Sequence, residues 1–317
     1  MLDKITILNL ADYKLPFENK VFTGDIDLDL IRGEINFVDP RIPDLFKLLN
    51  NSFKASRWGL FRYSSDTLRE EMSYLFNLDF KNKEEFINIS IQFSGRYRYV
   101  ALIDSGFFSE SENNCIFQEK IETIDTDEVI LEYNYLDDVI NVNRGSFNEI
   151  PLSRLQRKQE YDLKLEIEIM NKFYKSFVFL DWRTQFSPTP NLTNIRGQLQ
   201  NLFNLNEDYI WKIWEEYMPT LDLGFKKVIK DSVLFSCGEG KELVSLPASC
   251  LGTGAITLFK ILPVLTLKDR TIIVDNECSY FSELHPILTR HLLHNILFPE
   301  IEVERELLLY EHEGILL

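Results

Sequence analysis

The stretch CLGTGAITLFKILPVLTLKDRTIIVD (residues 250–275) joins a Gly-Thr turn, an apolar helical run and a buried strand that ends at Asp275. Free N–H groups and the positive dipole end at a helix start favour phosphate. An acid at the carboxyl end of a buried strand is where α/β proteins place a group that faces Mg²⁺. Either feature alone also occurs as a plain helix cap or an ordinary strand. Their order therefore predicts an α/β sheet with a phosphate-binding turn at Gly252 and Thr253.

Two further pieces follow this stretch. The sequence Leu-His-Pro-Ile-Leu-Thr-Arg occupies residues 284–290 and leads into a predicted helix. Residues 306–311 then read as an apolar strand followed by His312, which is expected to reach the same phosphate. A Gly-Thr turn, a helix, a strand with an acid, a Leu-His-Pro helix and a strand with a histidine form the layout of ABC-type ATPases.

On these motifs the chain resembles the AAA15 or AAA21 group of ABC-type ATPases, the abortive-infection and OLD-like proteins. Leu-Asp-Leu-Gly at 221–224 and Phe-Ser-Gly-Arg-Tyr-Arg-Tyr at 93–99 resemble other segments of that group. The resemblance implies a P-loop NTPase-like head, a mixed β-sheet flanked by helices, with an antiparallel β-rich subdomain and a helical insertion. It implies one domain over 1–317, with a β-rich lobe (1–150), an insertion (151–230) and an α/β lobe (231–317).

The same resemblance assigns the candidate site residues. Cys250, Gly252 and Thr253 take the signature-like positions, which would contact nucleotide across a dimer. The remnant Walker B and H-loop positions are Asp275, Glu277 and His312. The degenerate phosphate loop is Asp39, Pro40, Arg41 and Lys47.

The departures from the pattern concern the residues that would perform ATP hydrolysis. A phosphate loop needs G-x-x-x-x-G-K-[ST], whereas no glycine occurs between Val38 and Leu49. Prolines remove N–H donors there, and Asp39 would repel a triphosphate, although Arg41 or Lys47 offers a positive charge. Cys250 replaces the signature serine. Asn276 stands where the catalytic glutamate is expected, with Glu277 displaced by one residue, and an amide cannot accept the proton of the attacking water.

The leading hypothesis is therefore a pseudo-ATPase that serves as a binding, scaffold or sensor subunit, more a binding protein than an enzyme. The resemblance implies prokaryotic or phage antiviral defence, and a protein partner that is a related ATPase subunit or a toxin or nuclease effector, in a homo- or hetero-oligomer. No cofactor is expected, with ATP and Mg²⁺ held only at a composite site with a partner. The alternatives are an active ATPase with a non-standard phosphate loop and an acidic inhibitor or antitoxin-like protein. The sequence predicts no metal site, because His291 and His294 lack a nearby third ligand.

Composition limits the classes of function. The 317 residues carry 34 basic and 50 acidic side chains, and 34 − 50 = −16 disfavours direct nucleic-acid binding. Four scattered cysteines predict neither a disulfide framework nor a zinc ribbon. No signal peptide and no apolar run of about 20 residues is recognisable, which predicts a cytoplasmic protein without a membrane segment.

The rest of the chain gives clear local patterns. Strands are expected at 4–9 and 34–38, a hairpin at 86–103 with its turn at Ser94-Gly95, and helices at 44–53, 151–180 and 207–217. Residues 187–195 are expected to form a loop. The ten acids between 110 and 138 alternate with apolar residues, which predicts a sheet with a solvated acidic face or a face that docks a partner.

Overall fold

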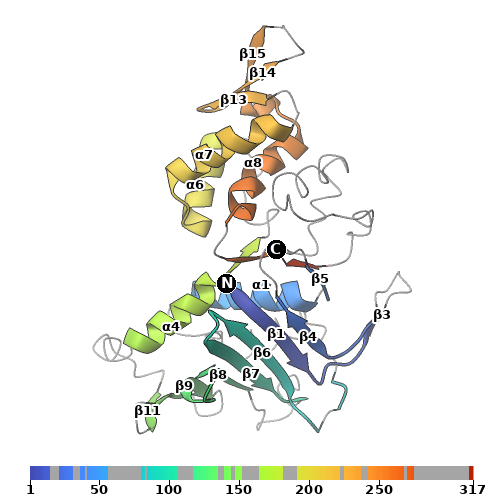
Figure 1. Cartoon of the computed structure of the whole chain (residues 1–317), viewed down its shortest axis with the longest axis vertical. Helices are drawn as coiled ribbons and strands as arrows, with labels where there is room; N and C mark the ends of the chain where they lie inside the picture. The colour runs from blue at the N-terminus through green and yellow to red at the C-terminus, as the bar shows by residue number, and fades with distance from the viewer. Residues whose placement is uncertain are drawn as a thin grey trace. The chain divides into compact units, whose positions relative to one another are not determined.

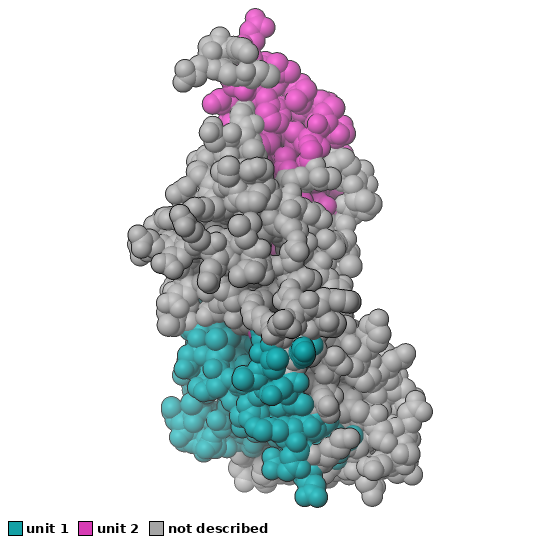
Figure 2. All heavy atoms as spheres, turned by 90° about the vertical axis from the view of Figure 1, so that its right-hand side faces the viewer, with its two compact units in different colours: residues 1–32, 41–177 teal, residues 33–40, 178–317 magenta. Residues whose placement is uncertain are grey.

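We describe the protein from a computed structural model. The described residues are 1–14, 21–30, 36–39, 41–55, 80–82, 84–105, 117–134, 139–143, 147–151, 164–180, 191–221, 225–236, 242–267, 270–274 and 314–316. The chain divides into two compact units (Figure 2). Unit 1 comprises residues 1–32 and 41–177, and unit 2 comprises residues 33–40 and 178–317. The sequence-based lobe boundaries at 150 and 230 stay predictions.

Unit 1 contains an eight-stranded antiparallel sheet in the order β11-β10-β9-β8-β7-β6-β1-β4 (Figure 1). Its strands are β1 (Leu2–Leu8), β4 (Ile26–Asp29), β6 (Ile87–Phe93), β7 (Tyr97–Ile103), β8 (Phe117–Thr123), β9 (Val129–Asn134), β10 (Val139–Asn143) and β11 (Phe147–Pro151). A small ribbon of β2 (Tyr13–Lys14) and β3 (Val21–Phe22) accompanies them. Apolar and polar residues alternate along these strands, as a sheet with one buried face requires. Strand β6, for example, buries every second residue.

The hairpin expected at 86–103 is confirmed. Ile87 lies opposite Ile103 and Phe93 opposite Tyr97, so the register runs without a slip. Ser94 and Gly95 both have positive φ, 57° and 62°. Arg96 N donates to Phe93 O at 3.4 Å, so Ser94 and Gly95 are the central residues of a β-turn, and positive φ at both is typical of type I′. Glycine adopts this conformation at no steric cost.

Two helices cover the apolar face of this sheet. Helix α1 (Arg41–Ala55) begins before the expected residue 44, because Pro43 is tolerated in a first turn. Helix α4 (Lys164–Lys175) places Phe173 against Phe93 and Tyr99, with ring centroids 5.0 Å apart in both pairs. Phe46 of α1 meets Phe177 edge-on at 4.9 Å. These aromatic contacts form the core of unit 1.

The described part of unit 2 contains three helices, α6 (Leu192–Phe203), α7 (Glu207–Tyr217) and α8 (Thr253–Leu265), with short 3-10 turns η3 (Met218–Leu221) and η4 (Ala248–Cys250). Its apolar cluster is centred on Trp214 and Phe259, both fully buried. The Trp214 indole Nε1 donates to the Phe259 carbonyl at 2.9 Å and fixes α7 to α8. The helix expected at 207–217 is therefore confirmed.

Two sheets complete unit 2. One is the antiparallel sheet of β13 (Phe225–Ile229), β14 (Ser232–Ser236) and β15 (Leu243–Pro247). The other has the order β12-β16-β17-β5, formed by β12 (Phe177–Leu180), β16 (Thr271–Val274), β17 (Gly314–Leu316) and β5 (Asn36–Val38). The molecule is thus a mixed α/β protein with a large antiparallel sheet.

Two sequence expectations are wrong at their ends. The helix expected over 151–180 does not include Phe177–Leu180, which is strand β12 and is buried at all four residues. A continuous apolar run that is buried at every residue suits a strand covered on both faces better than an amphipathic helix. The loop expected over 187–195 ends sooner, because the Asn191 side chain accepts from Asn194 N and caps α6 from Leu192 onward.

Candidate functional site

The four-stranded sheet brings together the two segments that the sequence analysis assigned to nucleotide. Strand β17 pairs antiparallel with both β16 and β5, so β5 and β16 run in the same direction. Ile315 of β17 lies opposite Val274 on one side and Phe37 on the other. The carboxyl ends of β5 and β16 therefore lie level at one edge of the sheet, separated by a single strand.

Asp39 directly follows β5 at this edge and is only 8% exposed. Asp275 is the next residue in the chain after β16, and it lies outside the described residues, as do Pro40, Glu277 and His312. The structure thus positions the strands that carry these candidates, while the catalytic assignments themselves stay predictions. Lys47 lies within α1 and is partly buried.

The connection from β5 to α1 is too short for a phosphate loop. Strand β5 ends at Val38 and α1 begins at Arg41, which leaves two residues, Asp39 and Pro40. A phosphate loop wraps a polyphosphate with a series of backbone N–H groups from an eight-residue motif. Proline has no N–H, so this connection offers one backbone donor and an acidic side chain.

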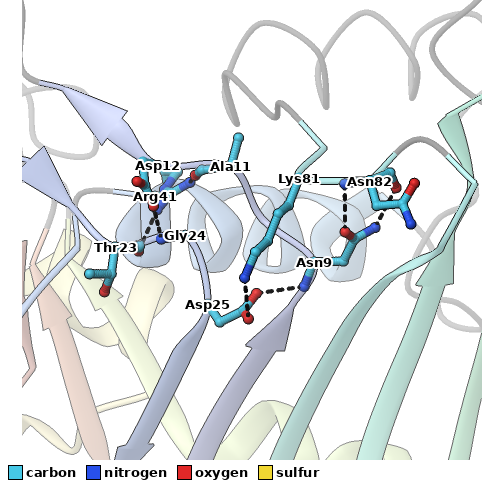
Figure 3. Close-up of polar contacts among 9 residues, drawn as sticks. All are labelled: Asn9, Ala11, Asp12, Thr23, Gly24, Asp25, Arg41, Lys81 and Asn82. Carbon is cyan, nitrogen blue, oxygen red and sulfur yellow. Dashed lines mark hydrogen bonds and ion pairs between the residues drawn. The ribbon is translucent and has the colours of Figure 1, made fainter.

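Arg41 has main-chain partners in unit 1 (Figure 3). Its Nη1 donates to the Ala11 carbonyl at 2.9 Å and its Nη2 to the Thr23 carbonyl at 3.4 Å. The side chain is 3% exposed. A guanidinium held this way joins the chain segments after β1 and after β3 to the start of α1. Arg41 therefore acts in folding and does not take the role of the missing phosphate-loop lysine.

The other polar residues drawn in Figure 3 also form hydrogen bonds and ion pairs within unit 1. Asn9, in the left-handed region at φ 67°, exchanges two hydrogen bonds with the Asn82 main chain, each 2.9 Å long. Asp25 accepts from Asn9 N at 2.7 Å and pairs with Lys81 at 3.5 Å. Asp12 accepts from Gly24 N at 2.8 Å. This network is a set of turn anchors, and the sequence analysis did not single it out although Asn and Asp are typical of such turns.

The signature-like residues lie at the start of α8. Gly252 is the N-cap, with φ −65° and ψ 157°, and its carbonyl accepts from Ile256 N at 3.1 Å. No side chain caps this helix at Gly252, and a Cβ placed there would meet nothing within 4 Å. Cys250 is exposed and its thiol is free. Neither backbone conformation nor packing within the described residues requires glycine at 252, which is exposed.

The acids between residues 110 and 138 were expected to lie on a solvated face of a sheet, and two of them are buried instead. Glu119 and Glu122, both on β8, are each 2% exposed. Glu122 is paired with Lys120 at 2.6 Å and with Arg98, whose Nε donates to it at 2.7 Å. Among the described acids of this stretch, the exposed ones are Asp125, Asp127 and Glu128 of the β8–β9 turn. The expected solvated acidic face is therefore wrong for Glu119 and Glu122. Glu119 lies on the core face of the sheet, where it accepts from Tyr99. Glu122 lies on the opposite face, where Lys120 and Arg98 cover its carboxylate.

Burial raises the pKa of Glu119 well above its ordinary value, and the hydrogen bond that it accepts from Tyr99 Oη at 3.1 Å opposes that shift only in part. A folded-state pKa above the unfolded value means that the contribution to stability is full below the unfolded pKa, about 4.3, and is lost as pH rises towards the folded pKa. We therefore expect Glu119→Gln to unfold at a higher urea concentration than the wild type at pH 8, and to lose the fall in stability between pH 5 and pH 8. Glu128→Gln, at an exposed position, should follow the wild type. An identical pH profile for Glu119→Gln and the wild type would contradict this.

Comparison with protein-family models, curated proteins and solved structures finds no match to this chain. None of the described helices is long and apolar enough to cross a membrane. The described residues contain no group of three or more side chains suited to hold a metal ion.

Proposed function

We propose that the chain is a catalytically degenerate relative of the ABC- and AAA15-type ATPases, and that it acts by binding a protein partner rather than by hydrolysing ATP. The observation that carries the proposal is the two-residue connection between β5 and α1. Phosphoryl transfer depends on positioning and on electrostatic stabilisation of the phosphates. A connection with one backbone N–H donor and one acidic side chain can neither position the phosphates nor stabilise their negative charge.

The order of the four-stranded sheet supports an ancestry in a nucleotide-binding head. Strands β5 and β16 are parallel to each other and end at the same edge. Ligands of open α/β sheets bind outside the carboxyl ends of the strands. The chain therefore keeps the framework of such a site and has lost the loop that would hold the phosphates.

The start of α8 supports a role in trans. Gly252 and Thr253 offer a helix N-terminus with open space at the glycine, the arrangement that favours an anion. In the family that the sequence resembles, this element faces the phosphate loop of the other subunit. In the proposed role, the chain completes the nucleotide site of an ATPase partner. ATP and Mg²⁺ are then held only in that composite site.

The isolated chain is expected not to bind or hydrolyse ATP. Calorimetric titration with ATP and Mg²⁺ should give no saturable heat, and phosphate release should stay at the background rate. A saturable, Mg²⁺-dependent hydrolysis that Asp275→Ala abolishes would overturn the proposal and favour the active ATPase with a non-standard loop. The control reaction is the Asp275→Ala chain prepared in parallel.

A matched pair of substitutions tests the role in trans. Aspartate and serine are both favoured N-cap residues, so Gly252→Asp and Gly252→Ser should melt within about 2 °C of the wild type. Only aspartate places a negative charge where the partner's nucleotide phosphates would lie. After co-purification with the products of neighbouring genes, the complex should gain mass with ATP for Gly252→Ser and fail to do so for Gly252→Asp. Equal ATP-dependent assembly of both variants would exclude this role.

The resemblance extends the proposal to prokaryotic or phage antiviral defence, with a toxin or nuclease as the partner. The acidic-inhibitor alternative is weakened, because Glu119 and Glu122 are buried and cannot contact a basic groove in the folded protein. Within the described part of this stretch, the acids left for such a contact are Asp125, Asp127 and Glu128 in the exposed β8–β9 turn.

A further inference from the structure

Helix α4 covers a cluster of three titratable side chains in unit 1. Glu119 of β8 is 2% exposed, Tyr99 of β7 is fully buried and Tyr174 of α4 is 8% exposed. Tyr99 Oη donates to the Glu119 carboxyl group at 3.1 Å. Burial, and next the charge of Glu119, raise the pKa of Tyr174, so this side chain of α4 lies close to the acid. These three residues form the Glu119 cluster, which lies between the helix and the sheet.

Aromatic packing holds α4 over this cluster. The Phe173 ring stacks on the Tyr99 ring, with centroids 5.0 Å apart and planes 24° apart. Phe173 also contacts Phe93 of β6, and both rings are fully buried. Because Tyr174 is the next residue of the same helix, lifting α4 removes one wall of the cluster and brings water to Glu119. Access of water to this carboxyl group is therefore linked to the position of α4.

The described strands around Glu119 present no basic side chain to it. In the sheet register, Tyr133 of β9 lies opposite Glu119. Opposed residues share a face of the sheet, so the titratable neighbours on these strands are Tyr99 and Tyr133. The basic residues Arg98 and Lys120 lie on the other face, because successive side chains of a strand point to opposite faces.

Helix α4 adds no cation to the cluster. Its lysines are all exposed, namely Lys164, Lys172 and Lys175. The charged residue that α4 buries is Glu166, which is a second acid. Glu119 therefore has one hydrogen-bond donor, Tyr99, and no counter-ion among the described residues.

These surroundings favour the neutral form of Glu119 in the folded protein. A carboxylate that is buried without a counter-ion is strongly unfavourable, whereas a protonated carboxyl group is neutral and still shares a hydrogen bond with a tyrosine hydroxyl. Burial accordingly raises the pKa of Glu119 well above its ordinary value. Burial also raises the pKa of Tyr99 and Tyr174, so both hydroxyl groups are neutral at pH 8. Glu119 is thus the member of the cluster that responds to pH near neutrality.

Main-chain bonding makes α4 the neighbour of Glu119 that opens at the lowest cost. Strand β8 is bonded to β7 on one side and to β9 on the other. Within the described residues, α4 is attached to the sheet through side-chain packing, without main-chain bonds to a strand. Such segments open locally at a lower free energy than strands inside a sheet.

We infer that lifting of α4 from the sheet and loss of the Glu119 proton to solvent occur together, so that this interface is a pH-sensitive switch within unit 1. The docked helix requires the protonated acid, and the hydrated acid of the open state is ionised. In the open state the pKa returns to about 4.3, so opening becomes about tenfold more favourable per pH unit above that value, until the pH reaches the pKa of the docked state. The switch involves neither the start of α8 nor nucleotide, and it is therefore independent of the proposed function.

The test is hydrogen exchange of the full chain, measured by mass spectrometry from pH 5 to pH 8 and corrected for the intrinsic exchange rate at each pH. In the wild type, the corrected exchange of residues 164–175 should rise about tenfold per pH unit from pH 5 and level off at the pKa of the docked state. Residues 87–93 of β6 should exchange about tenfold or more slowly than α4 at pH 7, because they open only when unit 1 unfolds. Urea well below the unfolding midpoint should accelerate exchange in 87–93 and leave 164–175 nearly unchanged, since lifting one helix exposes little surface.

Two substitutions separate the proton from the packing. Glu119→Gln keeps the size of the side chain and an oxygen that accepts from Tyr99, but it does not titrate, so the exchange of α4 should become independent of pH. Glu128→Gln, at an exposed position, should keep the wild-type dependence. Exchange of 164–175 in the wild type that does not change with pH, or that equals the exchange of 87–93, would overturn the inference. A rise with pH that persists in Glu119→Gln would do the same.

Discussion

Alanine at position 24 is expected to prevent unit 1 from folding. A Cβ on Gly24 would lie 1.8 Å from the Leu10 carbonyl oxygen, 2.8 Å from its carbon and 3.0 Å from the Ala11 carbonyl carbon. All three are main-chain atoms, so no side-chain rotation relieves the clash. The required shift would also break the 2.9 Å bond from Arg41 to Ala11 O and the 2.8 Å bond from Gly24 N to Asp12. Near-UV circular dichroism and soluble yield should report the loss.

Gly197 provides the matched control for this prediction. It lies inside α6, and a Cβ there would meet nothing within 4 Å. Alanine should therefore stabilise the helix by about 0.5–1 kcal/mol, since glycine loses more backbone freedom on folding. A Gly24→Ala chain that melts within about 2 °C of Gly197→Ala would contradict the close approach of Gly24 to Leu10.

Hydrophobic periodicity and turn or cap residues predicted the helices and strands for which these signals agree. The hairpin at 86–103 was predictable because period-two alternation and a Ser-Gly turn specify the same register. Helix α7 was predictable because its apolar positions follow one helical face and Asn206 caps it. Strand β12 was not, because four apolar residues after a helix give no periodicity by which to distinguish helix from strand.

The candidate site was predictable only in part, since it depends on contacts between distant segments. Sequence order suggested that β5 and β16 belong to one site, and their shared edge is in line with that idea. The partners of Arg41 were not predictable, because Ala11 and Thr23 present main-chain carbonyls that no side-chain pattern announces. The burial of Glu119 was also missed, because an acid on the core face of a strand breaks the alternation from which burial is inferred.

The second large effect is expected at Trp214, through a proline in the neighbouring helix. Pro263 lies inside α8 and has no N–H, so it cannot donate to the carbonyl of Phe259, four residues before it. The buried Trp214 indole donates to that carbonyl instead, at 2.9 Å. Trp214→Phe removes the donor and leaves a buried acceptor and a small void. We expect a loss of about 2–4 kcal/mol in the free energy of unfolding, measured with urea.

A double-mutant cycle isolates the hydrogen bond from the packing. Pro263→Ala restores an N–H that can reach the Phe259 carbonyl, so Trp214→Phe in that background should cost about 1 kcal/mol less than in the wild type. The packing loss is the same in both backgrounds and cancels. Equal costs in the two backgrounds would mean that Trp214 stabilises unit 2 by its volume alone. A smaller cost in the Pro263→Ala background would mean that the indole N–H compensates for the donor that proline removes from α8, which lets this apolar helix contain Pro263 near its C-terminal end.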